Sequence, residues 1–79
     1  MSPESIRQHV IDAWSTALPN AALDGRFFDQ GGGSLSAVLL VARLERTLGV
    51  EVPFAVLVST DGVEGLVSWV IQTLEVSAR

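Results

Sequence analysis

Residues 27–35 read FFDQGGGSL, and this segment decides how the rest of the 79-residue chain is interpreted. Two phenylalanines and three consecutive glycines precede a serine that opens an amphipathic stretch, so a flexible turn leads directly into a helix. The phenylalanines are expected to pin the turn to the core. The turn ends a loop that runs from Pro19 to Gly33, and a loop of this length in so small a domain is usually functional.

Three amphipathic helices are predicted around this loop. The first starts near Pro3, with Ser2 as its cap, and ends at Pro19-Asn20. The second runs from Ser34 to Leu48, before Gly49, and the third from Val63 to Glu75. Their apolar stripes at helical spacing are Ile6, Val10, Trp14, Ala17 and Leu18; Ala37, Leu40, Val41, Leu44 and Leu48; and Val63, Leu66, Val67, Val70, Ile71 and Leu74.

A short helical turn is predicted from Pro53 to Leu57 or Val58, after a connector at residues 50–52. Residues 59–62 are expected to supply capping side chains and a turn before the last helix. The fold class is therefore all-α. It is a four-helix bundle of three main helices and one short helix, and residues 1–79 form a single domain.

Composition excludes several function classes. Hydrophobic residues make up 48% of the chain and charged residues 18%, which favours a packed globule. The absence of cysteine excludes disulfides and thiolate metal sites and fits a cytoplasmic location, and no metal site is predicted. No signal peptide or membrane-spanning stretch is present. A net charge of −4 without any lysine argues against nucleic-acid binding.

Catalytic uses of Ser34 do not fit the surrounding residues. A phosphate-binding loop needs a lysine or a third, properly spaced glycine, and a hydrolase elbow needs a glycine at the position of Ser36. The only histidine, His9, lies on the first helix. We therefore predict no catalytic residue and interpret Ser34 as a serine that is modified; the alternative is a plain helix cap. A phosphodiester at a helix N-terminus would be favoured by free N–H groups and the helix dipole.

The chain resembles a known family. Its Phe-Phe-Asp-x-Gly-Gly-x-Ser-Leu, Val-x-Leu-Val-Ala-Arg-Leu and Leu-Gly-Val-x-Val-Pro segments, within residues 27–66, are similar to peptidyl carrier (thiolation) domains of nonribosomal peptide synthesis. Acyl carrier proteins of polyketide and fatty-acid synthesis are relatives. The resemblance implies an acyl carrier protein-type bundle in which Ser34 receives 4′-phosphopantetheine from coenzyme A through a phosphopantetheinyl transferase. The terminal thiol would hold an aminoacyl or acyl group as a thioester, which raises its effective concentration at partner enzymes.

The resemblance also implies partners. These are an adenylation or acyl-loading enzyme and condensation, tailoring or thioesterase enzymes, in a natural-product pathway such as antibiotic biosynthesis, with the carrier itself a non-catalytic monomer. Candidate partner-binding residues are Gly33, Leu35, Val38, Leu39 and Arg43. Exposed apolar residues can mark an interface. The alternative for Leu35 and Leu39 is that loop residues cover them.

Several positions depart from the family pattern. Gly33 stands where Asp is usual, Gln30 where an aliphatic residue is common, and Leu39 where Arg is frequent. The remaining departures are Val56 and Val58, in place of Asp and Phe, and Asp61-Gly62, in place of Pro-Ser/Thr. They indicate a divergent carrier with a more apolar docking surface, or an inactive one. The start at Met1 favours a free-standing carrier, although a fragment of a megasynthase would look the same.

Two other functions remain open at this point. One is an acyl carrier protein of polyketide synthesis, which would differ in its acyl group and loading enzyme. The other is a helical protein-interaction module without a prosthetic group.

Overall fold

A computed structural model describes residues 2–19 and 22–77, and over these residues the chain is helical, with no strand. The helices are α1 (Pro3–Ala17), η1 (Phe28–Gln30), α2 (Ser34–Leu48), α3 (Phe54–Ser59) and α4 (Val63–Ser77). The predicted bundle of three main helices and one short helix is confirmed. Asn20, part of the predicted end of the first helix, lies outside the described residues.

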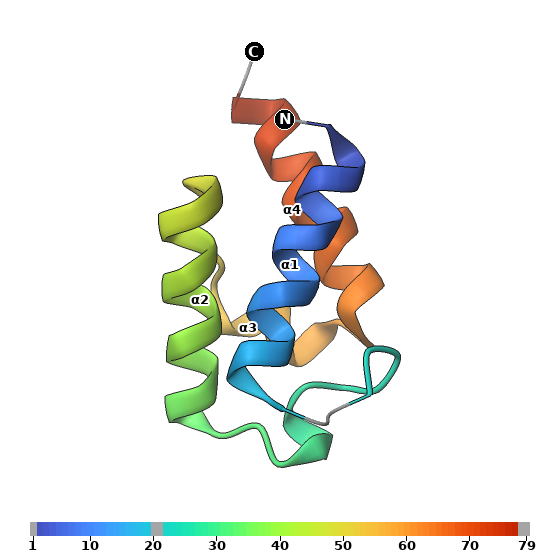
Figure 1. Cartoon of the computed structure of the whole chain (residues 1–79), viewed down its shortest axis with the longest axis vertical. Coiled ribbons are helices and arrows are strands. Elements are labelled where there is room, and N and C mark those ends of the chain that lie inside the picture. Colours follow the sequence, from blue (N-terminus) through green and yellow to red (C-terminus); the bar gives the residue numbers. More distant parts are fainter. Residues whose placement is uncertain (1, 20–21, 78–79) are drawn as a thin grey trace.

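Helix α1 is the centre of the bundle and contacts both α2 and α4 (Figure 1). The short α3 lies behind α1 in this view and contacts α4. Helix α1 begins and α4 ends at one end of the molecule, at the top of Figure 1. The loop after α1 and the start of α2 lie at the opposite end.

The predicted start of α1 and both predicted ends of α2 are confirmed, whereas α1 ends at Ala17, two residues before Pro19. Ser2 caps α1, because its hydroxyl accepts a hydrogen bond from the Ser5 N–H at 3.2 Å. Helix α2 ends where Gly49 adopts the left-handed conformation, with φ of 68° and its N–H bonded to the Glu45 carbonyl. Local residues therefore determine the start of α1 and the end of α2.

Most residues of the predicted apolar stripes are buried and form the core, whereas Val41, Leu48, Ile71 and Leu74 are only partly buried against it. Ala13 of α1 and the connector residues Val50 and Val52 are also buried. Two connector valines in the core explain how a segment without regular structure is held between α2 and α3. The fully buried large side chains are Trp14, Phe27, Leu40, Leu44, Leu57, Leu66, Val10, Val63 and Val70.

The predictions for the last two helices were partly wrong. Helix α3 continues to Ser59, and α4 continues two residues past Glu75. Among the described residues, no side chain of residues 59–61 caps α4; instead the Val63 N–H donates to the Leu23 carbonyl at 2.7 Å. A backbone group from a loop forty residues earlier takes the place of a local cap, and local sequence could not predict this.

Over residues 2–19 and 22–77, none of the helices combines the length and the apolarity that crossing a bilayer requires.

Candidate functional site

Ser34 is the first residue of α2 and is exposed at the surface. The cap position belongs to Gly33, whose backbone is extended (φ −114°, ψ −174°), so the alternative that Ser34 is merely the helix cap is wrong. Within residues 2–19 and 22–77, the Ser34 hydroxyl makes no hydrogen bond to the protein. The side chain is thus presented to solvent without a structural task in the fold.

The three glycines before Ser34 have different roles. Gly31 has φ of 87°, a left-handed conformation that favours glycine. At Gly32 a Cβ atom would lie 2.5 Å from the Phe27 carbonyl oxygen and 2.6 Å from its ring, so a side chain there would force the turn apart. A Cβ at Gly33 would meet nothing within 4 Å. The fold therefore requires glycine at the first two positions and leaves the third free.

Phe27 fixes this turn to the core, as the sequence predicted. Its ring is fully buried and meets Trp14 of α1 edge to face, with centroids 5.2 Å apart. Its carbonyl accepts the Gly32 N–H at 3.3 Å. Phe28 is half-buried and packs edge-on against Phe27. One aromatic anchor thus holds the backbone two residues before Ser34.

The electrostatic character of the site comes from the helix end. The Ala37 N–H donates to the Gly33 carbonyl, but among the described residues the N–H groups of residues 34–36 have no acceptor. Residues 30–42 carry no ionisable side chain. Free N–H groups and the positive end of the helix dipole favour an anion here by about 0.3–1 kcal/mol. The residues present therefore suit a phosphate ester on the Ser34 hydroxyl.

An apolar surface lies beside Ser34 on α2. Leu35, Val38 and Leu39 are 74%, 50% and 54% exposed, so the alternative that loop residues cover Leu35 and Leu39 is wrong. Arg43, half-buried, follows one turn after Leu39. Gly33 lies directly before α2, and the other four residues lie within the first three turns of that helix. We call Leu35, Val38 and Leu39 the α2 apolar patch.

Ser34 lies on the exposed surface at the start of α2. A hollow of about 410 Å³ lies near the other end of α2, lined by Pro3, Ile6, Thr47, Leu48, Ile71, Leu74 and Glu75. Leu48 is the last residue of α2, about 21 Å along the helix from Ser34. This hollow is therefore separate from the surface on which Ser34 lies.

Sequence reasoning missed one residue of the site. Gln30 was noted only as a departure, yet its carboxamide makes three hydrogen bonds that hold the loop before the glycines. A polar residue in a position that usually holds an aliphatic one was the available signal. Its partners are backbone groups of Ala22 and Arg26, which no spacing rule identifies.

The chain is a small helical bundle with an exposed serine at a helix N-terminus, directly after a glycine turn that is anchored to the core. This is the architecture of a carrier domain. Residues 6–70 match the family described as phosphopantetheine attachment site, and the chain belongs to this family. Domains of the family are the sites at which 4′-phosphopantetheine is attached covalently, and in general they are not themselves catalysts.

Two curated relatives are similar to the chain. The dimodular nonribosomal peptide synthase of Bacillus subtilis (strain 168) is 47% identical over 49 residues, which cover 62% of this chain and 2% of that protein. Indigoidine synthase of Dickeya dadantii (strain 3937) is 35% identical over 72 residues, 87% of this chain and 5% of that protein. The chain thus spans a small fraction of the length of either relative. No significant match to a solved structure was found.

Proposed function

We propose that the chain is a peptidyl carrier domain of nonribosomal peptide-type biosynthesis, with Ser34 as the residue that carries 4′-phosphopantetheine. The observation that carries this proposal is the exposed Ser34 hydroxyl, which makes no hydrogen bond within residues 2–19 and 22–77. It lies at a helix end without a side-chain cap, in a chain of the phosphopantetheine attachment family. The two relatives, a nonribosomal peptide synthase and indigoidine synthase, support the peptidyl type.

The modification replaces one bond to phosphorus by another. The Ser34 oxygen forms a bond to the phosphorus that bears the pantetheine group of coenzyme A. The bond from that phosphorus to the adenosine bisphosphate breaks, and the hydroxyl proton passes to a base of the transferase. The free N–H groups of residues 34–36 lie where they favour the resulting phosphodiester anion.

The attached group supplies a terminal thiol that holds an aminoacyl or acyl group as a thioester. The chain's own residues position it: Phe27 and the glycine turn fix the base of the attachment, and α2 holds Ser34 outward. Tethering raises the effective concentration of the bound group at each partner enzyme.

We infer that partners dock on the start of α2. Gly33, the α2 apolar patch and Arg43 would contact the phosphopantetheinyl transferase, the adenylation or other loading enzyme, and condensation, tailoring or thioesterase enzymes. The exposure of the patch supports this, because large apolar side chains beside a modified residue favour an interface. We further propose that residues 1–79 act as one monomeric domain in the cytoplasm, where coenzyme A is present.

The test is modification in solution. The protein is incubated with coenzyme A, Mg²⁺ and a broad-specificity transferase, and its intact mass is measured. We expect a gain of one phosphopantetheine in the wild type and in the matched control Ser36→Ala, and no gain in Ser34→Ala. A protein that stays unmodified even with its cognate transferase would favour the interaction module. Loading by a polyketide acyltransferase and not by an adenylation enzyme would favour the polyketide type.

A further inference from the structure

Three departures from the family pattern lie together in space. Gln30 is at the end of η1, and Asp61 and Gly62 lie just before α4, about thirty residues later. All three contact residues 22–26 of the loop that leads to Ser34. Departures scattered in the sequence therefore meet at one place, the segment that positions the glycine turn.

The Gln30 carboxamide is the centre of this contact set. Its Oε1 accepts the Ala22 N–H at 2.6 Å, and its Nε2 donates to the Ala22 carbonyl at 2.9 Å. Nε2 also donates to the Arg26 carbonyl at 3.2 Å. One side chain thus satisfies both backbone groups of Ala22, as a neighbouring strand would, and closes the loop on itself. We call residues 22–30, held in this way, the Gln30 clasp.

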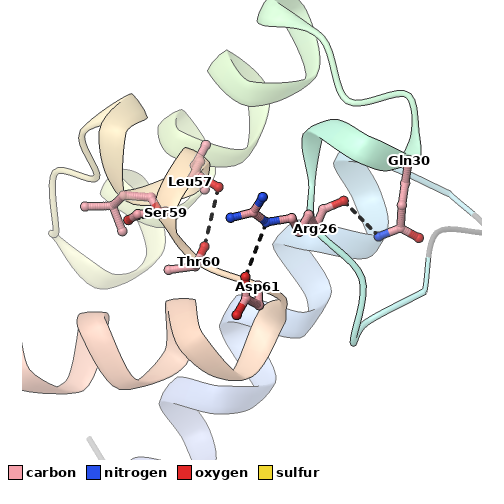
Figure 2. A network of polar contacts seen from close by, with 7 residues as sticks. Arg26, Gln30, Leu57, Ser59, Thr60 and Asp61 are labelled. Atoms are coloured by element: carbon pink, nitrogen blue, oxygen red, sulfur yellow. Dashed lines mark hydrogen bonds and ion pairs between the residues drawn. The ribbon is translucent and has the colours of Figure 1, made fainter.

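The clasp is joined to the start of α4. Figure 2 shows Arg26 between Gln30 and Asp61, with its carbonyl toward Gln30 and its guanidinium toward Asp61. The Arg26 Nε lies 3.3 Å from the Asp61 carboxylate, but both side chains are exposed, so this pair contributes little. The Leu23 carbonyl binds the Val63 N–H at 2.7 Å. The clasp therefore has a fixed support outside the loop.

Gly25 makes room for the clasp. A Cβ atom at Gly25 would lie 2.8 Å from the Gln30 Nε2 and 2.9 Å from its Cδ. The Gly25 φ is outside the left-handed region, so alanine is compatible with the backbone and only the carboxamide would have to move. Gly25 and Gln30 are thus a matched pair: the first is small because the second occupies the space.

We propose that Gln30 is a positioning residue for the modification of Ser34. The clasp ends at Gln30, directly before Gly31, so it determines the direction in which the glycine turn and Ser34 leave the loop. When the carboxamide is lost, the loop samples open conformers and only a fraction of molecules presents Ser34 correctly. The apparent affinity of the transferase then falls by that fraction, while the rate in the bound complex is unchanged. This inference rests on the proposed function.

The test compares four variants in the transferase assay: Gln30→Ala, Gly25→Ala, the double variant and Gln30→Leu. Gln30→Ala removes three hydrogen bonds, so we expect KM for the carrier to rise about tenfold and kcat to stay nearly unchanged. The melting temperature should fall by roughly 5–10 °C, because the closed loop is lost from the native state. Gln30→Leu should behave like Gln30→Ala. As a single substitution, Gly25→Ala should raise KM. In the Gln30→Ala background it should cause no further rise, because the contact that it disturbs is already lost.

A second readout does not depend on modification. Hydrogen exchange at the Ala22 amide, which donates to Gln30, should be at least about tenfold faster in Gln30→Ala and in Gly25→Ala than in the wild type. Unchanged KM and unchanged exchange would overturn the inference, as would additive effects of Gly25→Ala and Gln30→Ala. Full recovery by Gln30→Leu would also overturn it, because packing would then replace the hydrogen bonds. A wild-type protein that is never modified would instead overturn the proposed function.

Discussion

The Phe27 ring meets the Trp14 indole edge to face, with centroids 5.2 Å apart and ring planes at 79°. Both side chains are fully buried, one from the loop and the other from α1. Because the Phe27 carbonyl also accepts the Gly32 N–H, this aromatic contact connects the hydrophobic core to the turn that presents Ser34. Both the stability of the core and the position of the turn before Ser34 therefore depend on Phe27.

Replacing Phe27 by leucine should therefore destabilise the protein. The substitution keeps an apolar side chain but loses the aromatic contact, so we expect the free energy of unfolding to fall by about 1–2 kcal/mol in urea denaturation. Phe28→Leu is the matched control, because Phe28 is only half-buried. Phe28→Leu should lower the free energy of unfolding by less than half as much as Phe27→Leu does. Equal effects of the two substitutions would mean that Phe27 is not the anchor of the loop.

The glycines at 32 and 33 should respond differently to alanine. Gly32→Ala places a Cβ against the Phe27 carbonyl, and we expect a loss of about 1–3 kcal/mol in the free energy of unfolding. A Cβ at position 33 has no neighbour within 4 Å, so Gly33→Ala should change the free energy of unfolding by less than about 1 kcal/mol. Urea denaturation of the pair measures the difference. If Gly33→Ala proved the more damaging, the described turn would be incorrect.

The ion pair between α1 and α4 should make stability depend on pH in acid. The Arg7 Nε donates to the Glu64 carboxylate at 2.8 Å, and this hydrogen bond lowers the pKa of Glu64 below its ordinary value of 4.5. A lowered pKa in the folded state gives a contribution that is present above pH 4.5 and is lost as the pH falls through the folded pKa. The same contact raises the pKa of Arg7, which therefore stays charged throughout.

Urea denaturation of the wild type and Glu64→Gln at pH 7 and pH 3 tests this. At pH 7 the free energy of unfolding should be slightly larger for the wild type than for Glu64→Gln. This difference in the free energy of unfolding should be smaller at pH 3. Because both side chains are exposed, added salt should reduce the difference at pH 7. A difference that grows in acid would contradict the assigned pairing.

The α2 apolar patch should control recognition by the transferase. Leu35→Asp places a charge on an exposed apolar side chain, so we expect kcat/KM for modification to fall about tenfold or more with little change in stability. Val76→Asp, at a similarly exposed position late in α4, is the matched control and should be nearly neutral. Equal effects of the two would show that partners do not dock on the patch.

Docking on this surface should also depend weakly on salt. Residues 30–42 carry no ionisable side chain, so little Coulomb attraction is available for screening near Ser34. We expect kcat/KM to change by less than about threefold between 50 and 300 mM NaCl. A steep fall with salt would indicate that more distant charges, such as Arg43, dominate the encounter.

Much of the fold was predictable because its determinants are local. The Ser2 cap, the left-handed Gly49 and the apolar stripes of α1, α2 and α4 each depend on residues close in sequence. The cap of α4 was not predictable, because it is the carbonyl of Leu23, which only the folded chain brings to Val63. Long-range contacts between backbone groups leave no pattern in a single sequence.

The site divides in the same way. Ser34 and the glycines stood out as a motif, and the Phe27 anchor followed from aromatic residues beside a turn. The separate roles of Gly32 and Gly33 required coordinates, since only the distance to Phe27 distinguishes them. The hydrogen bonds of Gln30 were likewise invisible, because their partners are main-chain atoms whose identity the sequence does not encode.

Locating the attached group on the chain tests the central claim most directly. After incubation with coenzyme A, Mg²⁺ and transferase, the protein is digested, and the modified peptide is fragmented in a mass spectrometer. The account predicts that phosphopantetheine is found on Ser34 and that the nearby Ser36 is unmodified. Phosphopantetheine on any other residue, or its continued attachment in Ser34→Ala, would contradict the account.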